Sequence, residues 1–174
     1  MSKQQQQPQT HEFYLNRAIE IAQENIRDGG RPFGSVLVLD NNIIAQGVNT
    51  MHVNGDPTAH AELNAIRDVG IKQGVSVLPN CVVYASGQPC PMCLSLMYLV
   101  GIKEVYYANS NQDGEPYSLS TASILHQLSK PLPDQSININ HIPLPNSLYE
   151  NWFNNKQQHN NNYSSKKEYY RLYV

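Results

Sequence analysis

The sequence predicts an α/β protein, because apolar residues at helical spacing alternate along it with short apolar runs typical of strands. Residues 81–109 read as strand, helix and strand, which predicts two parallel strands joined by a crossover helix. A chain of 174 residues is long enough to bury a core without disulfides or a structural metal. We therefore expect one α/β domain and do not expect two independent ones.

The predicted elements follow from the residue pattern in chain order. Apolar residues at helical spacing between Leu15 and Ile26 predict a first helix that ends at "DGG". "SVLVLD" and "NIIAQG" flank Asn41 and Asn42, which tolerate positive φ, so residues 35–47 predict a β-hairpin. Strands are expected at 81–86 and 104–109, and helices at "HAELNAIRDV", "PMCLSLMYLVGI", "STASILHQLSK" and "NSLYENWF".

Composition indicates which parts of the chain form the domain and which classes of partner to expect. Polar tracts occupy residues 4–9 and 154–167, so we expect a flexible tail over 1–9, the domain over 10–155 and a polar and aromatic tail over 156–174. The formal charge of -2 gives no reason to expect a nucleic acid or a membrane as partner. Three cysteines and no hydrophobic secretory segment indicate a cytoplasmic protein with reduced thiols.

Two short motifs carry the chemistry. Cys90 and Cys93 in "PCPMC" have a spacing that zinc sites and redox disulfides share, and they open a predicted helix. His60 and Glu62 in "HAE" open another predicted helix. Helix N-termini stabilise thiolates, so the position of Cys90 and Cys93 at the start of a helix favours their metal-binding form. His60, Cys90 and Cys93 supply three zinc ligands and leave a fourth position for water, the pattern of a catalytic zinc. Glu62 is then free to carry the proton of that water.

The cysteines allow two other interpretations. A redox pair of Cys90 and Cys93 leaves His60 and Glu62 without a role. A structural zinc site needs a fourth ligand, and the remaining cysteine, Cys81, begins a predicted buried strand, where it is expected to act as a small apolar residue. The catalytic zinc site is therefore favoured.

His-Ala-Glu followed by Pro-Cys-x-x-Cys resembles the signature of the zinc-dependent cytidine deaminase superfamily. The resemblance runs from about residue 10 to 109 and implies a three-layer α/β/α fold around a central five-stranded mixed sheet, with one zinc ion per subunit. It also implies the reaction: water adds to a ring carbon that bears an exocyclic amine, Glu62 moves the protons, ammonia leaves and a carbonyl remains.

Within the superfamily, "RPFGSVLV", "GDPTAHAE" and "PCPMC" are most similar to bacterial guanine deaminases and to related tRNA adenosine deaminases. The resemblance implies a purine-type nucleobase or a related small heterocycle as substrate, guanine first. It places Asn49 in a hydrogen bond to the ring, Phe33 stacked on it and Ala61 beside it. Alternatives are a tRNA adenosine deaminase, which needs a basic surface, a cytosine or nucleoside deaminase, and a catalytically silent zinc scaffold.

Two places depart from the pattern of guanine deaminases. A "GFDD"-like segment is replaced by "PYSLSTA", with Ser120 and Thr121 where aspartates are expected, so Asp113 and Glu115 are candidates for the missing carboxylate. Gln88 of "GQPC" replaces the glutamate of "EPC", and a neutral amide there can still orient groups around the metal.

The end of the chain also resembles guanine deaminases. "NWF" and "KKEYY" are similar to a tail that closes over the partner's pocket in a domain-swapped dimer. A disordered end with incidental tyrosines is the alternative for this tail. The apolar run "LSLMYLVGI" is richer in apolar residues than a helix with one buried face needs. We therefore expect a homodimer.

Overall fold

The structure is a computed structural model that describes residues 9–160, apart from the side chains of residues 54 and 157–160. Contacts divide the chain into two units, Met1–Ala122 and Ser123–Val174. The first unit contains the sheet and the candidate site. Most of the predicted N-terminal tail and the "KKEYY" segment lie outside the described residues.

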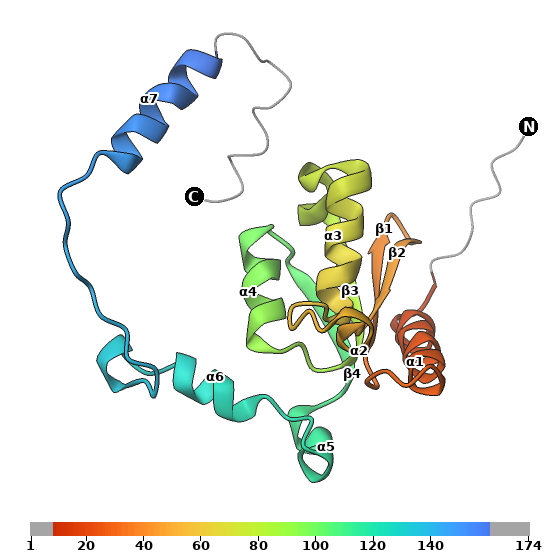
Figure 1. The fold of residues 1–174 in the computed structure, drawn as a ribbon. Helices are drawn as coiled ribbons and strands as arrows, with labels where there is room; N and C mark the ends of the chain where they lie inside the picture. Colours follow the sequence, from red (N-terminus) through yellow and green to blue (C-terminus); the bar gives the residue numbers. More distant parts are fainter. Residues whose placement is uncertain (1–8, 161–174) are drawn as a thin grey trace, which may run out of the picture. The chain divides into compact units, whose positions relative to one another are not determined.

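One mixed β-sheet organises the first unit (Figure 1). Its order is β2, β1, β3, β4, formed by Asn42–Val48, Gly34–Leu39, Val82–Gly87 and Glu104–Asn109. Strand β1 pairs antiparallel with β2 and β3, whereas β3 and β4 are parallel, as the predicted crossover requires. The α/β class is confirmed. The resemblance implied five strands, and the described part of the chain contributes four to this sheet.

Helices cover both faces of the sheet (Figure 1). Helix α1, His11–Arg27, packs on one face against Val36, Val38 and Tyr84, and α3 (Ala61–Gln73) and α4 (Pro91–Leu99) cover the other. The larger core lies under α3 and α4. Its fully buried side chains include Leu37, Val69, Leu78, Val83 and Cys93.

The first helix and the hairpin form as predicted, with one shift. Thr10 caps α1 by accepting a hydrogen bond from the Phe13 amide at 3.2 Å. In the hairpin turn, Asp40 and Asn41 take positive φ of 48° and 62°, whereas the prediction placed the turn at Asn41 and Asn42. Asn42 instead begins β2, because Asp tolerates the left-handed region nearly as well as Asn and the turn can start one residue earlier.

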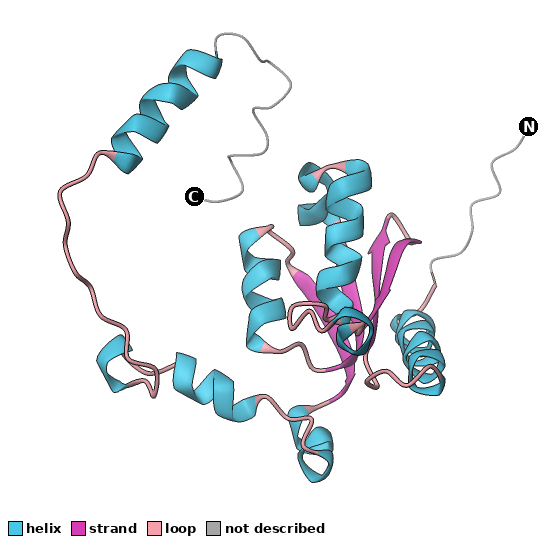
Figure 2. Cartoon of the chain, in the orientation of Figure 1, coloured by secondary structure: helices cyan, strands magenta, loops and turns pink. Residues whose placement is uncertain are grey.

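Further helices connect and follow these elements (Figure 2). In the first unit they are α2 (Met51–Asn54), η1 (Val75–Asn80), α5 (Asn111–Gly114) and η2 (Glu115–Tyr117). Helix α6, Ala122–Leu128, begins at the end of that unit, and η3 (Leu132–Asp134) and α7 (Leu148–Asn160) belong to the second. Among the described residues, no helix is long and apolar enough to cross a membrane.

Candidate metal centre and adjoining cavity

Two helix N-termini bring the sequence motifs together. His60 is the N-cap of α3 and Cys90 is the N-cap of α4, with Pro91 at the first helical position, where a missing N–H costs no hydrogen bond. Gly47 of β2 lets α3 start close to the sheet, because a Cβ there would overlap the Ala61 carbonyl oxygen. Both helix starts therefore meet at the same side of the sheet.

His60, Cys90 and Cys93 form a cluster whose ligand atoms all lie within 4.8 Å of one another. Cys90 Sγ is 3.4 Å from His60 Nδ1, Cys93 Sγ is 3.7 Å from the same nitrogen, and the two sulfurs are 3.5 Å apart. Tetrahedral zinc separates such sulfur and nitrogen ligands by about 3.5–3.8 Å, given its usual bond lengths. The three residues therefore fit a zinc ion.

Glu62 lies beside this cluster and is 7% exposed. Its Oε2 accepts a hydrogen bond from Cys93 Sγ at 3.5 Å. Burial raises the pKa of Glu62, because removing the carboxylate from water disfavours its charged form. A carboxyl group with a raised pKa is suited to take up and return protons near neutral pH.

The thiols differ in their proton affinity although they are neighbours. The pKa of Cys90 is lowered to about 4, first by its hydrogen bond with Cys93 and then by the one with His60. The same hydrogen bond, together with burial, raises the pKa of Cys93. The hydrogen bond to Cys90 also raises the pKa of His60. A thiolate is therefore already favoured at Cys90, which is the form that binds a metal.

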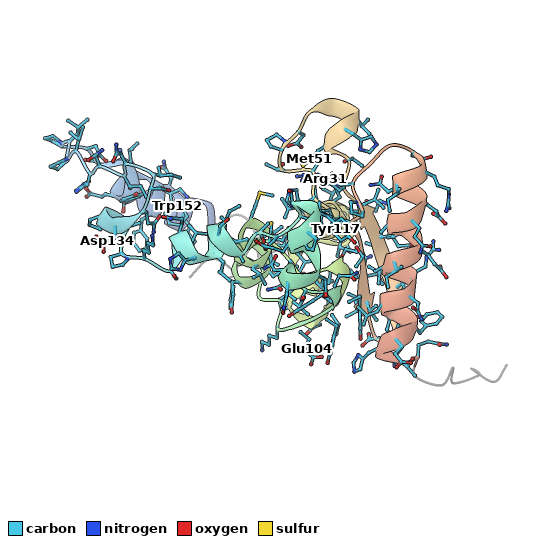
Figure 3. All side chains as sticks on the ribbon, turned by 90° about the horizontal axis from the view of Figure 1, so that it is seen from below. Arg31, Met51, Glu104, Tyr117, Asp134 and Trp152 are labelled. Atoms are coloured by element: carbon cyan, nitrogen blue, oxygen red, sulfur yellow. The ribbon has the colours of Figure 1, made fainter. Side chains whose placement is uncertain are left out.

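A small cavity of about 50 Å³ opens on this cluster. Its walls include the predicted substrate contacts Phe33, Asn49 and Ala61 together with His60, Glu62 and Cys90, whereas Cys93, Asp113 and Glu115 do not line it. A second cavity, of about 390 Å³, shares Phe33, Gln88 and Leu119 with it. Figure 3 labels Arg31, which lines the smaller cavity, and Tyr117, which lines the larger one.

Asn49 and Phe33 are held by the backbone around them. Asn49 is 1% exposed, its backbone amide donates to the Phe33 carbonyl at 3.1 Å, and its Oδ1 accepts from the Met51 amide at 3.3 Å. Asn25 of α1 is also buried, and its Nδ2 donates to the carbonyl oxygens of Arg31 and Asn49 at 2.8 and 2.9 Å. One helix side chain therefore fixes both segments that carry the predicted base contacts.

Asp113 and Glu115 do not line the small cavity at the metal cluster. The Asp113 carboxylate accepts hydrogen bonds from the Ser110 amide and hydroxyl at 2.8 and 2.7 Å, as part of a capping box of α5. These bonds lower the pKa of Asp113. Asp113 lines the larger cavity, whereas Glu115 is exposed and lines neither of the two.

Sequence reasoning missed part of the wall of the small cavity. Arg31 and Leu119 were not singled out, and Gln88 and Thr121 were noted as departures from a pattern rather than as lining residues. Thr121 donates from its amide to Asn111 Oδ1 at 2.9 Å, which brings the segment after β4 over the cavity. These residues lie in loops, so no periodic pattern marks them. Arg31 could have been predicted to line the cavity because it lies two residues before Phe33, a predicted base contact.

Comparisons with known proteins agree with this geometry. Residues 8–109 match the cytidine and deoxycytidylate deaminase zinc-binding region. Guanine deaminase from Bacillus subtilis is 36% identical over 162 residues, which are 91% of this chain and 99% of that protein. Its crystal structure aligns with a TM-score of 0.77, covering 92% of this chain and 99% of that one.

A structure from a study of tRNA:A34 deaminases is also similar, at 28% identity and a TM-score of 0.58 over 76% of this chain and 94% of that one. The region matched by the family takes in both motifs and all four strands of the sheet. The motifs, the fold and the relatives agree, and the chain belongs to the cytidine and deoxycytidylate deaminase family.

Proposed function

We propose that this protein is a zinc-dependent hydrolase that deaminates a purine-type nucleobase, with guanine as the substrate. The observation that carries the proposal is Glu62, a buried carboxyl group beside three residues spaced as zinc ligands. The Bacillus subtilis guanine deaminase, similar over nearly all of both chains, supports guanine over other bases.

The chain's residues divide the chemistry between them. His60, Cys90 and Cys93 would hold the zinc ion, and the ion would lower the pKa of a bound water to about 7. Glu62 accepts a proton from the water that adds to the ring carbon bearing the amine. It delivers that proton to the adjacent ring nitrogen and then carries the hydroxyl proton to the amine nitrogen, so that the C–N bond breaks, ammonia leaves and a carbonyl remains.

Substrate binding falls to the walls of the small cavity. The Phe33 ring stacks on the base, Asn49 donates and accepts hydrogen bonds along one ring edge, and Ala61 closes the floor beside Glu62. Gly87 leaves room for the Phe33 ring, since a Cβ there would lie 3.0 Å from Phe33 Cε1.

The loop after β4 supplies the remaining contacts that we propose. Asp113 lines the larger cavity, and we propose that its carboxylate contacts the edge of the base from there. Glu115 is an alternative contact from the same loop.

Ammonia release from guanine, adenine, cytosine and their nucleosides by the zinc-loaded protein tests this function. We expect guanine to be deaminated with kcat/KM at least about tenfold above every other compound, because a site built to hydrogen-bond one base rejects analogues that leave its polar groups unpaired. Higher activity on cytosine or on a nucleoside would overturn the choice of guanine while leaving the zinc chemistry in place. Absence of ammonia from every compound would overturn the proposal.

A tRNA adenosine deaminase is the second candidate, favoured by the similar tRNA:A34 deaminase structure. Binding of a folded polyanion relies on lysine and arginine side chains. The chain has 12 of these against 14 acidic residues, which favours the small substrate. Inosine formation in an anticodon stem-loop RNA is the measurement that separates the two.

A homodimer is part of the proposal. Helix α4 presents Tyr98, which is 83% exposed, and Leu99, which is 49% exposed, although the helix is almost entirely apolar. Apolar side chains on a surface helix are typical of an interface. We assign this face to a second copy of the chain and the protein to the cytoplasm, where its three free cysteines stay reduced.

A further inference from the structure

Asn64 lies in the first turn of α3, and its side chain reaches the end of β2. Its Nδ2 donates hydrogen bonds to the Val48 carbonyl oxygen at 2.9 Å and to Thr50 Oγ1 at 3.1 Å. Its Oδ1 accepts a hydrogen bond from Arg67 Nη1 at 3.0 Å. A guanidinium group can only donate, so this contact fixes the side-chain amide with its N–H groups toward Val48 and Thr50.

The two acceptors of Asn64 lie on either side of Asn49 in the chain. Val48 ends β2, and Asn49 and Thr50 follow it directly. Asn49 is 1% exposed, lines the small cavity and is the residue that we propose to hydrogen-bond the base. One side chain of α3 therefore holds the backbone before Asn49 and the hydroxyl group after it.

Asn64 also belongs to the helix that carries part of the metal centre. Its backbone amide donates to the His60 carbonyl oxygen at 2.9 Å, and Glu62 lies in the same turn. A second bond joins the same two segments, because the Thr50 amide donates to the Ala59 carbonyl oxygen at 3.0 Å. The side chain of Asn64 thus connects the base-binding segment to the helix start that contains His60 and Glu62.

The proposed reaction depends on where the base lies relative to Glu62, because a displacement of about 1 Å can cost about a hundredfold in rate. Asn25 holds the Asn49 carbonyl from α1, whereas Asn64 holds the neighbours of Asn49 from the helix that contains Glu62. We propose that Asn64 is a positioning residue that sets the distance between Asn49 and Glu62. This inference rests on the proposed function and adds a residue to it.

Asn64→Asp removes the two donors and keeps the shape of the side chain. The carboxylate still accepts from Arg67, but it faces the Val48 carbonyl oxygen without an N–H. With zinc-loaded protein, we expect kcat/KM for guanine to fall at least about tenfold, with kcat lowered and KM raised, because the base is displaced from Glu62. Zinc content should be unchanged. Asn16→Asp, the same change at an exposed position of α1, is the matched control and should have native kcat/KM.

A double substitution separates positioning from general stabilisation. Asn64 acts through Asn49 in this account, so its loss should matter little once Asn49 cannot bind the base. We expect Asn64→Asp to change kcat/KM by less than about twofold in an Asn49→Ala background, whereas independent effects would multiply. Single-turnover rates at high enzyme concentration keep the slow variants measurable.

Asn64→Ala adds no charge and favours the helix, so it takes the place of Asn64→Asp if melting curves show that the aspartate variant is unfolded at the assay temperature. Native kcat/KM in the folded variant would overturn the inference. An equal decrease with and without Asn49→Ala would also overturn it, since Asn64 would then act independently of Asn49. Failure of both variants to fold would make Asn64 a structural residue and would equally overturn it. A native protein that does not deaminate guanine would overturn the proposed function, and with it the inference.

Discussion

At the scale of one residue, Glu62 serves proton transfer and also affects the free energy of unfolding. The side chain is 7% exposed, and burial raises its pKa above the ordinary value. In the metal-free protein, the folded state therefore binds the Glu62 proton more tightly than the unfolded state does. A carboxyl group that is prepared for proton transfer thus carries a cost in folding when the zinc is absent.

The cost of Glu62 should depend on pH with a definite sign. As pH rises from about 4.5, the unfolded state loses the proton first, so the unfolding free energy falls until pH passes the folded pKa. Each tenfold change in proton affinity corresponds to about 1.4 kcal/mol. We expect metal-free Glu62→Gln to melt at a higher temperature than the metal-free native chain at about pH 8, with the gap closing toward about pH 4. A gap that does not change with pH would contradict the burial argument.

Two buried cysteines have different roles: Cys93 is a predicted zinc ligand, and Cys81 is a core residue. Cys93 and Cys81 are both buried and free, but only Cys93 belongs to the metal cluster. We expect Cys93→Ser to reduce bound zinc at least about tenfold, measured by atomic absorption after dialysis, because serine is a poor zinc ligand. Cys81→Ser is the control for burial and should retain its zinc. Equal zinc content in the two variants would place the metal elsewhere.

At the scale of elements, α1 positions the cavity from the far side of the sheet. The Asn25 side-chain amide joins the carbonyl oxygens of Arg31 and Asn49, which precede and follow the hairpin of β1 and β2. Gly30 packs directly on that amide, where a Cβ would overlap it. The helix thus sets the distance between the segments that carry Phe33 and Asn49.

Removal of the Asn25 amide should loosen substrate binding. Asn25→Ala removes the donor to the Asn49 carbonyl and one of the two donors to the Arg31 carbonyl, which still accepts from the Phe33 amide, at a cost of about 1–3 kcal/mol in unfolding free energy. We expect KM for guanine to rise several-fold with a smaller change in kcat and with unchanged zinc content. Asn16→Ala, at an exposed position of the same helix, is the matched control. A change confined to kcat would mean that Asn25 does not act through the base-binding segments.

The elements also show what sequence can predict. Periodicity and turn residues located α1, the hairpin, β3, α4 and β4, and the motif spacing predicted that His60 meets Cys90 and Cys93. The sequence did not predict that Arg31 and Leu119 line the cavity, because tertiary hydrogen bonds, and no local pattern, bring their loops there. The orientation of Gln88 followed only from its hydrogen bond to the amide of Asn111, which lies in another element.

At the scale of the whole molecule, the proposed dimer should depend on α4. Light scattering at micromolar concentration is expected to give twice the mass of the 19.6 kDa chain. Tyr98→Asp places a charge on the exposed apolar face of α4 and should shift the protein toward the monomer while the zinc stays bound. A native protein that is monomeric under these conditions would contradict the dimer.

The most direct test of the account is the turnover of guanine by zinc-loaded native protein and by Glu62→Gln, with zinc content measured on the same samples. The account predicts that both proteins bind one zinc ion and that the native protein releases ammonia from guanine. The variant should be slower by at least about a hundredfold, since proton transfer contributes about 10²–10⁴-fold and the isosteric amide cannot supply it. Retained deamination by Glu62→Gln would contradict the assignment of Glu62 as the proton carrier.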